Sequence, residues 1–137
     1  MSDLLQKLRA QPLPLAMTLG IEFTEARPEL VEARMKVRQE ICTRPDILHG
    51  GAVMALADTV GAAATVINLP PGASTTTIES KTNFLAAIAL GDTAIARAKP
   101  FHRGKTTMVW QTEISRQSDG RLAAVVTQTQ MVLLPKS

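Results

Sequence analysis

The sequence predicts an α+β fold in which a curved antiparallel sheet of about six strands wraps round one long central helix. The helix is predicted from residues 49–68, a run with almost no polar face, because a helix that is apolar all round must be enclosed by other elements. The strands are predicted from stretches on both sides of this run in which apolar and polar residues alternate with a period of two. With 137 residues and 45% hydrophobic content, the chain is expected to be a single domain over residues 1–137.

The first predicted element is a short amphipathic helix at about residues 2–11, in which Leu4, Leu5 and Leu8 share one face. The Pro12-Leu13-Pro14 segment is expected to end this helix, since proline disrupts helical hydrogen bonds. A strand is expected from residue 19 onward, where every second residue is apolar.

The clearest predicted strand covers residues 31–37, where apolar residues alternate with charged ones. Its core-facing residues are Val31, Ala33, Met35 and Val37. Residues 41–48 are expected to be irregular, because Pro45 prevents regular pairing. The central helix then begins at His49-Gly50-Gly51 and ends near Asn68, since the following Leu69-Pro70-Pro71-Gly72 segment cannot continue it.

Four further strands are predicted at residues 75–84, 93–101, 106–116 and 122–134. The connections between them are short and contain glycine, as tight turns require. These connections are Leu90-Gly91-Asp92, His102-Arg103-Gly104-Lys105 and Ser118-Asp119-Gly120. We therefore expect the four strands to form a meander, each paired with the next.

Composition excludes several classes of function. The basic residues are scattered, and only three phenylalanines and one tryptophan could stack on bases, so nucleic acid is not an expected partner. Two histidines and one cysteine offer no ligand spacing for a metal, and no phosphate-binding loop or serine-hydrolase motif is present. The apolar central run is too short and too alanine-rich to predict a membrane span. The single cysteine and an N-terminus unlike a signal peptide predict a cytoplasmic location.

One ionisable side chain, Asp58, lies within the apolar central run. A carboxylate in such a setting requires hydrogen bonds, an ion pair or a function. At the start of the helix, glycines allow a ligand oxygen to approach unpaired backbone N–H groups and the positive end of the helix dipole. The N–H groups of Gly50 and Gly51 are therefore candidates for an oxyanion site, with Asp58 either attacking a carbonyl carbon or activating water.

Structural explanations for the same residues stay open at this point. Asp58 could cap a helix that begins at Thr59, or could be satisfied by Thr59 and Thr65. His49 could simply close the loop by bonding the backbone.

The spacing of His49 and Asp58 carries a consequence for assembly. The two residues are nine positions apart, which corresponds to roughly 13 Å along a helix axis. One carbonyl group cannot reach both. If both act on one substrate, Asp58 must face the His49-Gly50 end of a helix in a second copy, and the protein must be at least a homodimer with two shared active sites.

Four short segments resemble the phenylacetate-degradation (PaaI-like) acyl-CoA thioesterases of the hotdog superfamily. They are Leu48-His49-Gly50-Gly51, Leu56-Ala57-Asp58, Asn83-Phe84-Leu85 and Leu90-Gly91-Asp92. The resemblance implies the hotdog fold, hydrolysis of an acyl-CoA or aryl-CoA to the free acid and CoA, and a homodimer that assembles as a dimer of dimers. It assigns the first oxyanion donor to Gly50 and implies that no cofactor is needed, since CoA is part of the substrate.

The resemblance also extends to two helper positions. Similar proteins often carry Asn or Gln six residues before the histidine, whereas this chain has Thr43, which can still donate one hydrogen bond. A hydroxyl on the strand after the helix is expected at Thr77, with Thr75 and Thr76 as neighbouring registers.

Further residues are candidates for holding the substrate. Gly51 would flank the thioester and Met54 would form a wall of the acyl pocket. Arg103 and Lys105, on a predicted hairpin, would bind the phosphates of CoA, with Lys81 as a further candidate. Two other functions stay open: a non-catalytic acyl-CoA-binding module, and a hotdog-type hydratase or dehydratase acting on enoyl or hydroxyacyl thioesters.

Overall fold

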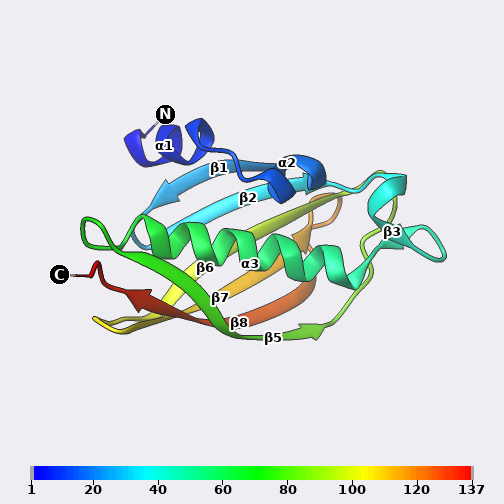
Figure 1. Ribbon diagram of the computed structural model, residues 1–137. Helices are drawn as coiled ribbons and strands as arrows, with labels where there is room; N and C mark the ends of the chain where they lie inside the picture. Colours follow the sequence, from blue (N-terminus) through cyan, green and yellow to red (C-terminus); the bar gives the residue numbers. More distant parts are fainter. Residues whose placement is uncertain (1, 137) are drawn as a thin grey trace.

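The computed structural model describes residues 2–136 and has one long helix lying against the concave face of a six-stranded antiparallel sheet (Figure 1). The helix is α3 (Gly50–Val66), and the strand order is β1-β2-β6-β7-β8-β5. The strands are β1 (Ile21–Arg27), β2 (Leu30–Lys36), β5 (Ser74–Phe84), β6 (Thr93–Arg103), β7 (Thr107–Arg116) and β8 (Leu122–Leu133). This arrangement confirms the predicted α+β fold.

The strands β6, β7 and β8 form a meander, in which each pairs with the next. The prediction that β5 belongs to this meander is wrong, because β5 pairs with β8 at the far edge of the sheet. The residues between β5 and β6 make no hairpin. Instead, the backbone of Gly91 and Asp92 exchanges hydrogen bonds with Val37, directly after β2, which places β6 beside β2.

The side chain of Asp92 holds this crossing segment in place. Its carboxylate accepts hydrogen bonds from the Thr93 N–H at 2.7 Å, the Ser118 N–H at 3.1 Å and the Ser118 hydroxyl at 2.6 Å. The Ser118 hydroxyl, followed by the backbone N–H groups, holds the pKa of Asp92 below its usual value. The Leu90-Gly91-Asp92 segment therefore joins the start of β6 to the turn between β7 and β8.

Two helices precede the sheet. The first, α1 (Asp3–Ala10), lies at the predicted position and packs on β1. The second, α2 (Pro14–Leu19), corrects the prediction that residue 19 begins a strand. Pro14 stands at the first turn of α2, where its missing N–H interrupts no hydrogen bond. Gly20, with φ of 76°, ends α2 in the left-handed conformation.

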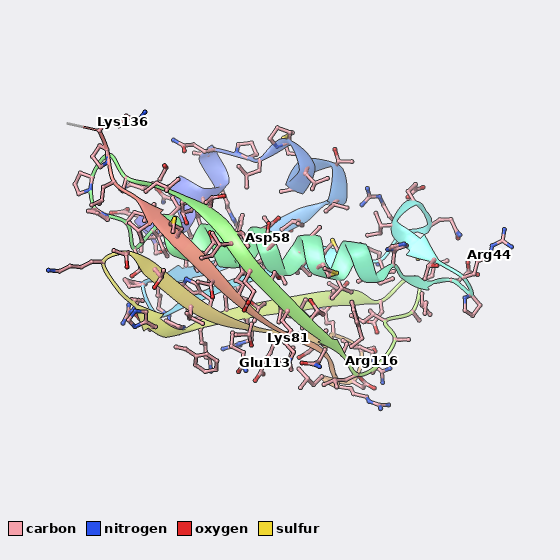
Figure 2. The ribbon with its side chains drawn as sticks, turned by 60° about the horizontal axis from the view of Figure 1, so that its bottom comes forward. Arg44, Asp58, Lys81, Glu113, Arg116 and Lys136 are labelled. Carbon is pink, nitrogen blue, oxygen red and sulfur yellow. The ribbon has the colours of Figure 1, made fainter. Side chains whose placement is uncertain are left out.

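The segment before α3 is more regular than predicted. The short helix η1 (Gln39–Ile41) leads into a small hairpin, β3 (Cys42–Thr43) and β4 (Ile47–Leu48). Because Pro45 lies in the turn between the two strands, its missing N–H interrupts no pairing. The hairpin projects beyond the N-terminus of α3 and carries Arg44 at its tip (Figure 2).

The core lies between α3 and the sheet. Leu56, Ala57 and Val60 of the helix are fully buried. In the single chain, however, α3 is not enclosed on all sides as the sequence pattern predicts, because Met54 and Val66 are 42% and 52% exposed. These two residues lie on one stripe of α3 that also holds the half-buried Asp58. Among residues 2–136, no helix combines the length and apolar character needed to traverse a bilayer.

Candidate active site

The N-terminus of α3 presents one unpaired backbone donor. His49 is the N-cap, and its Nδ1 accepts a hydrogen bond from the Gly51 N–H at 2.7 Å. The N–H groups of Ala52 and Val53 donate to the His49 carbonyl. Within the described residues, the Gly50 N–H has no hydrogen-bond partner, so it is free to bind an oxygen atom of a ligand.

The two predicted oxyanion donors differ in this capping geometry. The N–H of Gly51 is occupied by His49, so the prediction that Gly51 offers a second donor is wrong. Because the His49 imidazole accepts at Nδ1, its neutral form carries the proton on Nε2. His49 therefore orients the loop around Gly50.

Gly50 also borders a cavity. A Cβ at this position would lie 3.2 Å from the ring of Phe84, so the glycine keeps the backbone accessible. The cavity has a volume of about 270 Å³ and is mostly apolar, with Thr43, Phe84 and Leu85 among its lining residues. The structure thus brings Thr43, the predicted helper, to the same cavity as Gly50.

A second cavity, of about 320 Å³, lies on the other side of the helix start. It is lined by residues of α2 and by His49, Gly51 and Cys42. Desolvation of the Cys42 thiol, reinforced by the carboxylates of Asp46 and Glu40, raises its pKa. Because the thiolate is the nucleophilic form of cysteine, Cys42 is a poor candidate nucleophile.

Asp58 lies in the middle of α3, half-buried beside β5 (Figure 2). The Thr77 hydroxyl donates a hydrogen bond of 2.7 Å to its Oδ1, and Gln128 Nε2 lies 3.4 Å from the same oxygen. Because α3 begins at Gly50, Asp58 does not cap a late-starting helix. Thr65 is not its partner either, because that hydroxyl donates to the Gly61 carbonyl. The structure brings Asp58 together with Thr77, the hydroxyl to which the family resemblance assigns a helper role.

Two further residues of this layer, Gln128 and Gln130 of β8, are absent from the sequence-based prediction. Both are 0% exposed, and Gln130 Nε2 donates to the Thr77 hydroxyl at 2.6 Å. A signal for them exists in the sequence. They occupy the inward register of β8, which elsewhere holds the buried Val126 and Val132. A polar residue in a core register requires a partner, and here the partners lead to Asp58.

The side chain of Gln128 requires the glycine at position 61. A Cβ on Gly61, one turn after Asp58, would lie 2.3 Å from Gln128 Oε1. Glycine within a helix costs about 1 kcal/mol relative to alanine, so its presence reflects this close approach.

We expect Gly61→Ala to destabilise the fold by about 1–3 kcal/mol, because the fully buried Gln128 amide must shift to make space for the added methyl group. Urea unfolding of the two proteins measures the difference. In a Gln128→Ala background the same substitution should be stabilising, because the clash is gone and alanine favours the helix. Destabilisation of equal size in both backgrounds would show that the contact with Gln128 is not the cause.

Of the other predicted site residues, one lies near Asp58 and two lie at the far end of α3. Met54 shares its helical stripe, one turn earlier. Arg103 lies near the opposite end of α3 from Gly50, where its Nη1 donates to the Pro28 carbonyl at 3.2 Å and to Asn68 Oδ1 at 3.4 Å. Lys105 lines a cavity of about 680 Å³ at the same end, together with Arg103 and Asn68.

Lys81 does not lie beside Asp58. It follows a β-bulge in β5 and is exposed, whereas its neighbours Ser80 and Thr82 are partly buried. Since side chains alternate along a strand, Lys81 points to the outer face of the sheet. Figure 2 places it further along β5 from Asp58, toward Glu113 and Arg116. Among residues 2–136, no three His, Cys, Asp or Glu side chains lie close enough to share a metal ion.

The profile of the Thioesterase superfamily matches residues 45–123, a range that contains Gly50, Asp58 and Thr77. A candidate esterase of Pasteurella multocida is 36% identical over 101 residues, which cover 74% of this chain and 72% of that protein.

Solved structures share the whole fold. The thioesterase HI1161 of Haemophilus influenzae superposes with a TM-score of 0.89 at 27% identity, covering 100% of this chain and 94% of its own. The PaaI protein of the E. coli phenylacetic acid degradation operon gives 0.83 at 26%, covering 93% and 90%. A hypothetical thioesterase of Streptococcus pneumoniae, solved with coenzyme A, gives 0.76 at 26%, covering 85% and 88%.

Proposed function

The chain belongs to the thioesterase superfamily, and we propose that it hydrolyses acyl-CoA or aryl-CoA thioesters to the free acid and CoA. The family and its solved members confirm the resemblance seen in the sequence and make the chain a thioester hydrolase. The observation that carries the proposal is the presence on one helix of an unpaired N–H at Gly50 and a hydrogen-bonded carboxylate at Asp58. The neighbour solved with coenzyme A supports CoA as the thiol part of the substrate.

In the proposed reaction, the carbonyl oxygen of the thioester accepts a hydrogen bond from the Gly50 N–H at the positive end of α3. Asp58 either adds to the carbonyl carbon or removes a proton from the water molecule that adds to it. The negative charge that develops on the oxygen is stabilised by the N–H. Collapse of the intermediate breaks the carbon–sulfur bond, and CoA leaves as a thiolate that then takes up a proton. Where Asp58 has added directly, the mixed anhydride that remains is hydrolysed by a water molecule, which releases the free acid and restores the carboxylate.

The reacting groups are proposed to come from two subunits. Gly50 and Asp58 of one chain are eight residues apart on α3, or roughly 12 Å along its axis, so they cannot act on the same carbonyl. We place Asp58 opposite Gly50 of the partner subunit, in a homodimer with two shared sites.

Two uncovered surfaces support this dimer. The first is the stripe of α3 that holds Met54 and Asp58. The second is β5, which lies at an edge of the sheet and carries Ile78 at 53% exposure. An open strand edge can pair with the same strand of a second copy, which would bring the two helices together. Association of two such dimers as a dimer of dimers is the further assembly that we propose.

Arg103 and Lys105 are the proposed ligands of the CoA phosphates. We expect the charge reversals Arg103→Glu and Lys105→Glu to raise KM for a CoA thioester by about 5- to 10-fold and to leave kcat unchanged, because the nucleotide lies away from the reacting bond. The increase should shrink as salt rises. A short thioester that lacks the nucleotide is the internal control, and its KM should not change. An unchanged KM for the CoA thioester would place the nucleotide elsewhere.

The experiment that tests the proposed function is a panel of acyl-CoA and aryl-CoA thioesters, with release of free thiol as the readout. Hydrolysis of at least one class is the expected result. Binding of the thioesters without thiol release would instead indicate a non-catalytic acyl-CoA-binding module. Hydration or dehydration of the acyl chain with the thioester intact would indicate the hydratase or dehydratase alternative.

A further inference from the structure

Asp58 stands at the end of a partly buried series of hydrogen bonds that has only one direction. A carboxylate only accepts, so the Thr77 hydroxyl must donate its single proton to Asp58 Oδ1. The Thr77 oxygen can then only accept, and the amide nitrogen of Gln130 supplies that bond at 2.6 Å. On the other side of Gln130, the Thr75 hydroxyl lies 2.9 Å from Oε1 and 2.8 Å from the Met131 carbonyl, and its single proton can go to either acceptor. Gln130 therefore fixes the direction in which Thr77 donates.

The two oxygens of Asp58 have different surroundings. Oδ1 accepts from Thr77 and faces Gln128 Nε2 at 3.4 Å. In the part of the chain that the structure describes, Oδ2 accepts no hydrogen bond. The network thus occupies one oxygen and leaves the other available on the uncovered stripe of α3.

On the basis of the thioesterase function proposed above, we propose that Gln130 is a positioning residue that acts through Thr77 to hold Asp58 Oδ1. Gln128 holds the same oxygen from the other side. Oδ2 is then the atom that attacks the thioester carbonyl or accepts the proton of water. Neither glutamine touches the substrate in this arrangement.

Packing alone gives no reason for these glutamines. Gln128 Oε1 is buried without a hydrogen-bond partner among the described residues, which lowers stability. The same inward-facing positions of β8 hold valine at residues 126 and 132, so apolar side chains can fill this part of the core. What the two amides contribute is their contact with Thr77 and Asp58.

The test is a double-mutant cycle in kcat between Gln130→Met and Thr77→Val. Each single variant should lower kcat by about 10-fold with KM nearly unchanged, because a hydrogen bond to the ionised carboxylate is lost or misdirected. The double variant should be no slower than Thr77→Val alone, since Gln130 acts only through Thr77. Thr112→Val is the matched control. It removes from the neighbouring strand β7 a buried hydroxyl that has no hydrogen-bond partner among residues 2–136, and kcat should not change.

Three results would overturn the proposal: an unchanged kcat in Gln130→Met, losses that multiply in the double variant, or an equal loss in Thr112→Val. A crystal structure of Gln130→Met provides a readout that does not depend on turnover. It should show the Thr77–Asp58 hydrogen bond broken or the carboxylate rotated, and an unchanged carboxylate would count against positioning. Absence of thiol release by the wild type would instead defeat the proposed function, and the crystal structure would still decide the role of Gln130.

Discussion

Replacing Asp58 with asparagine is expected to lower kcat by a factor of about 10² or more. The amide cannot take a proton from water or add to a carbonyl carbon. The fold should persist, because an asparagine oxygen can still accept the hydrogen bonds of Thr77 and Gln128 that Oδ1 accepts now. Thiol release measures kcat, and circular dichroism checks the fold.

The matched control for this substitution is Asp3→Asn, which removes an exposed carboxylate from the first turn of α1. It should leave kcat unchanged. If Asp58→Asn retained near-wild-type turnover with an intact fold, Asp58 would have no part in the mechanism, and the oxyanion site alone would have to explain any activity.

The second large effect is the recovery of activity from two inactive variants. Asp58→Asn lacks the carboxylate, and Gly50→Pro lacks the N–H donor, whose loss should lower kcat by about 10²–10³. If each site takes Asp58 from one subunit and Gly50 from the other, a heterodimer of the two variants contains one complete site. With free exchange of subunits, about half of the dimers are heterodimers, so roughly a quarter of wild-type activity should return.

The backbone conformation around position 50 can accommodate the proline of Gly50→Pro. Position 50 is the first residue of α3, where proline is favoured, and His49 has φ −62° and ψ 136°, the extended conformation that a following proline requires. The remaining effect is crowding of Phe84, which Gly50→Ala tests separately because alanine keeps the N–H. Gly50→Ala should therefore be much more active than Gly50→Pro. If mass measurement demonstrates subunit exchange and the mixture stays inactive, the shared site is excluded.

Much of the fold can be read from the sequence, because local patterns determine it. The alternation of Val31, Ala33, Met35 and Val37 predicts β2, and the apolar run after His49 predicts α3, since period and burial are local properties of the chain. Asp58 and Gly50 could be singled out for the same reason. A lone carboxylate in an apolar run and glycines at a helix start are visible without any knowledge of contacts.

Pairing and hydrogen-bond partners depend on distant parts of the chain, and only the tertiary structure decided them. The sequence could not show that β5 pairs with β8, because the residues of a strand do not identify the strand with which it pairs. It left open whether His49 bonds the backbone, and the structure shows that its imidazole accepts a hydrogen bond from the N–H of Gly51. Gln130 and Thr77 are 53 residues apart and meet only because β5 and β8 are neighbours in the sheet. The sequence thus determined the kind of fold and the two principal groups of the candidate site, while long-range strand pairing decided which side chains surround Asp58.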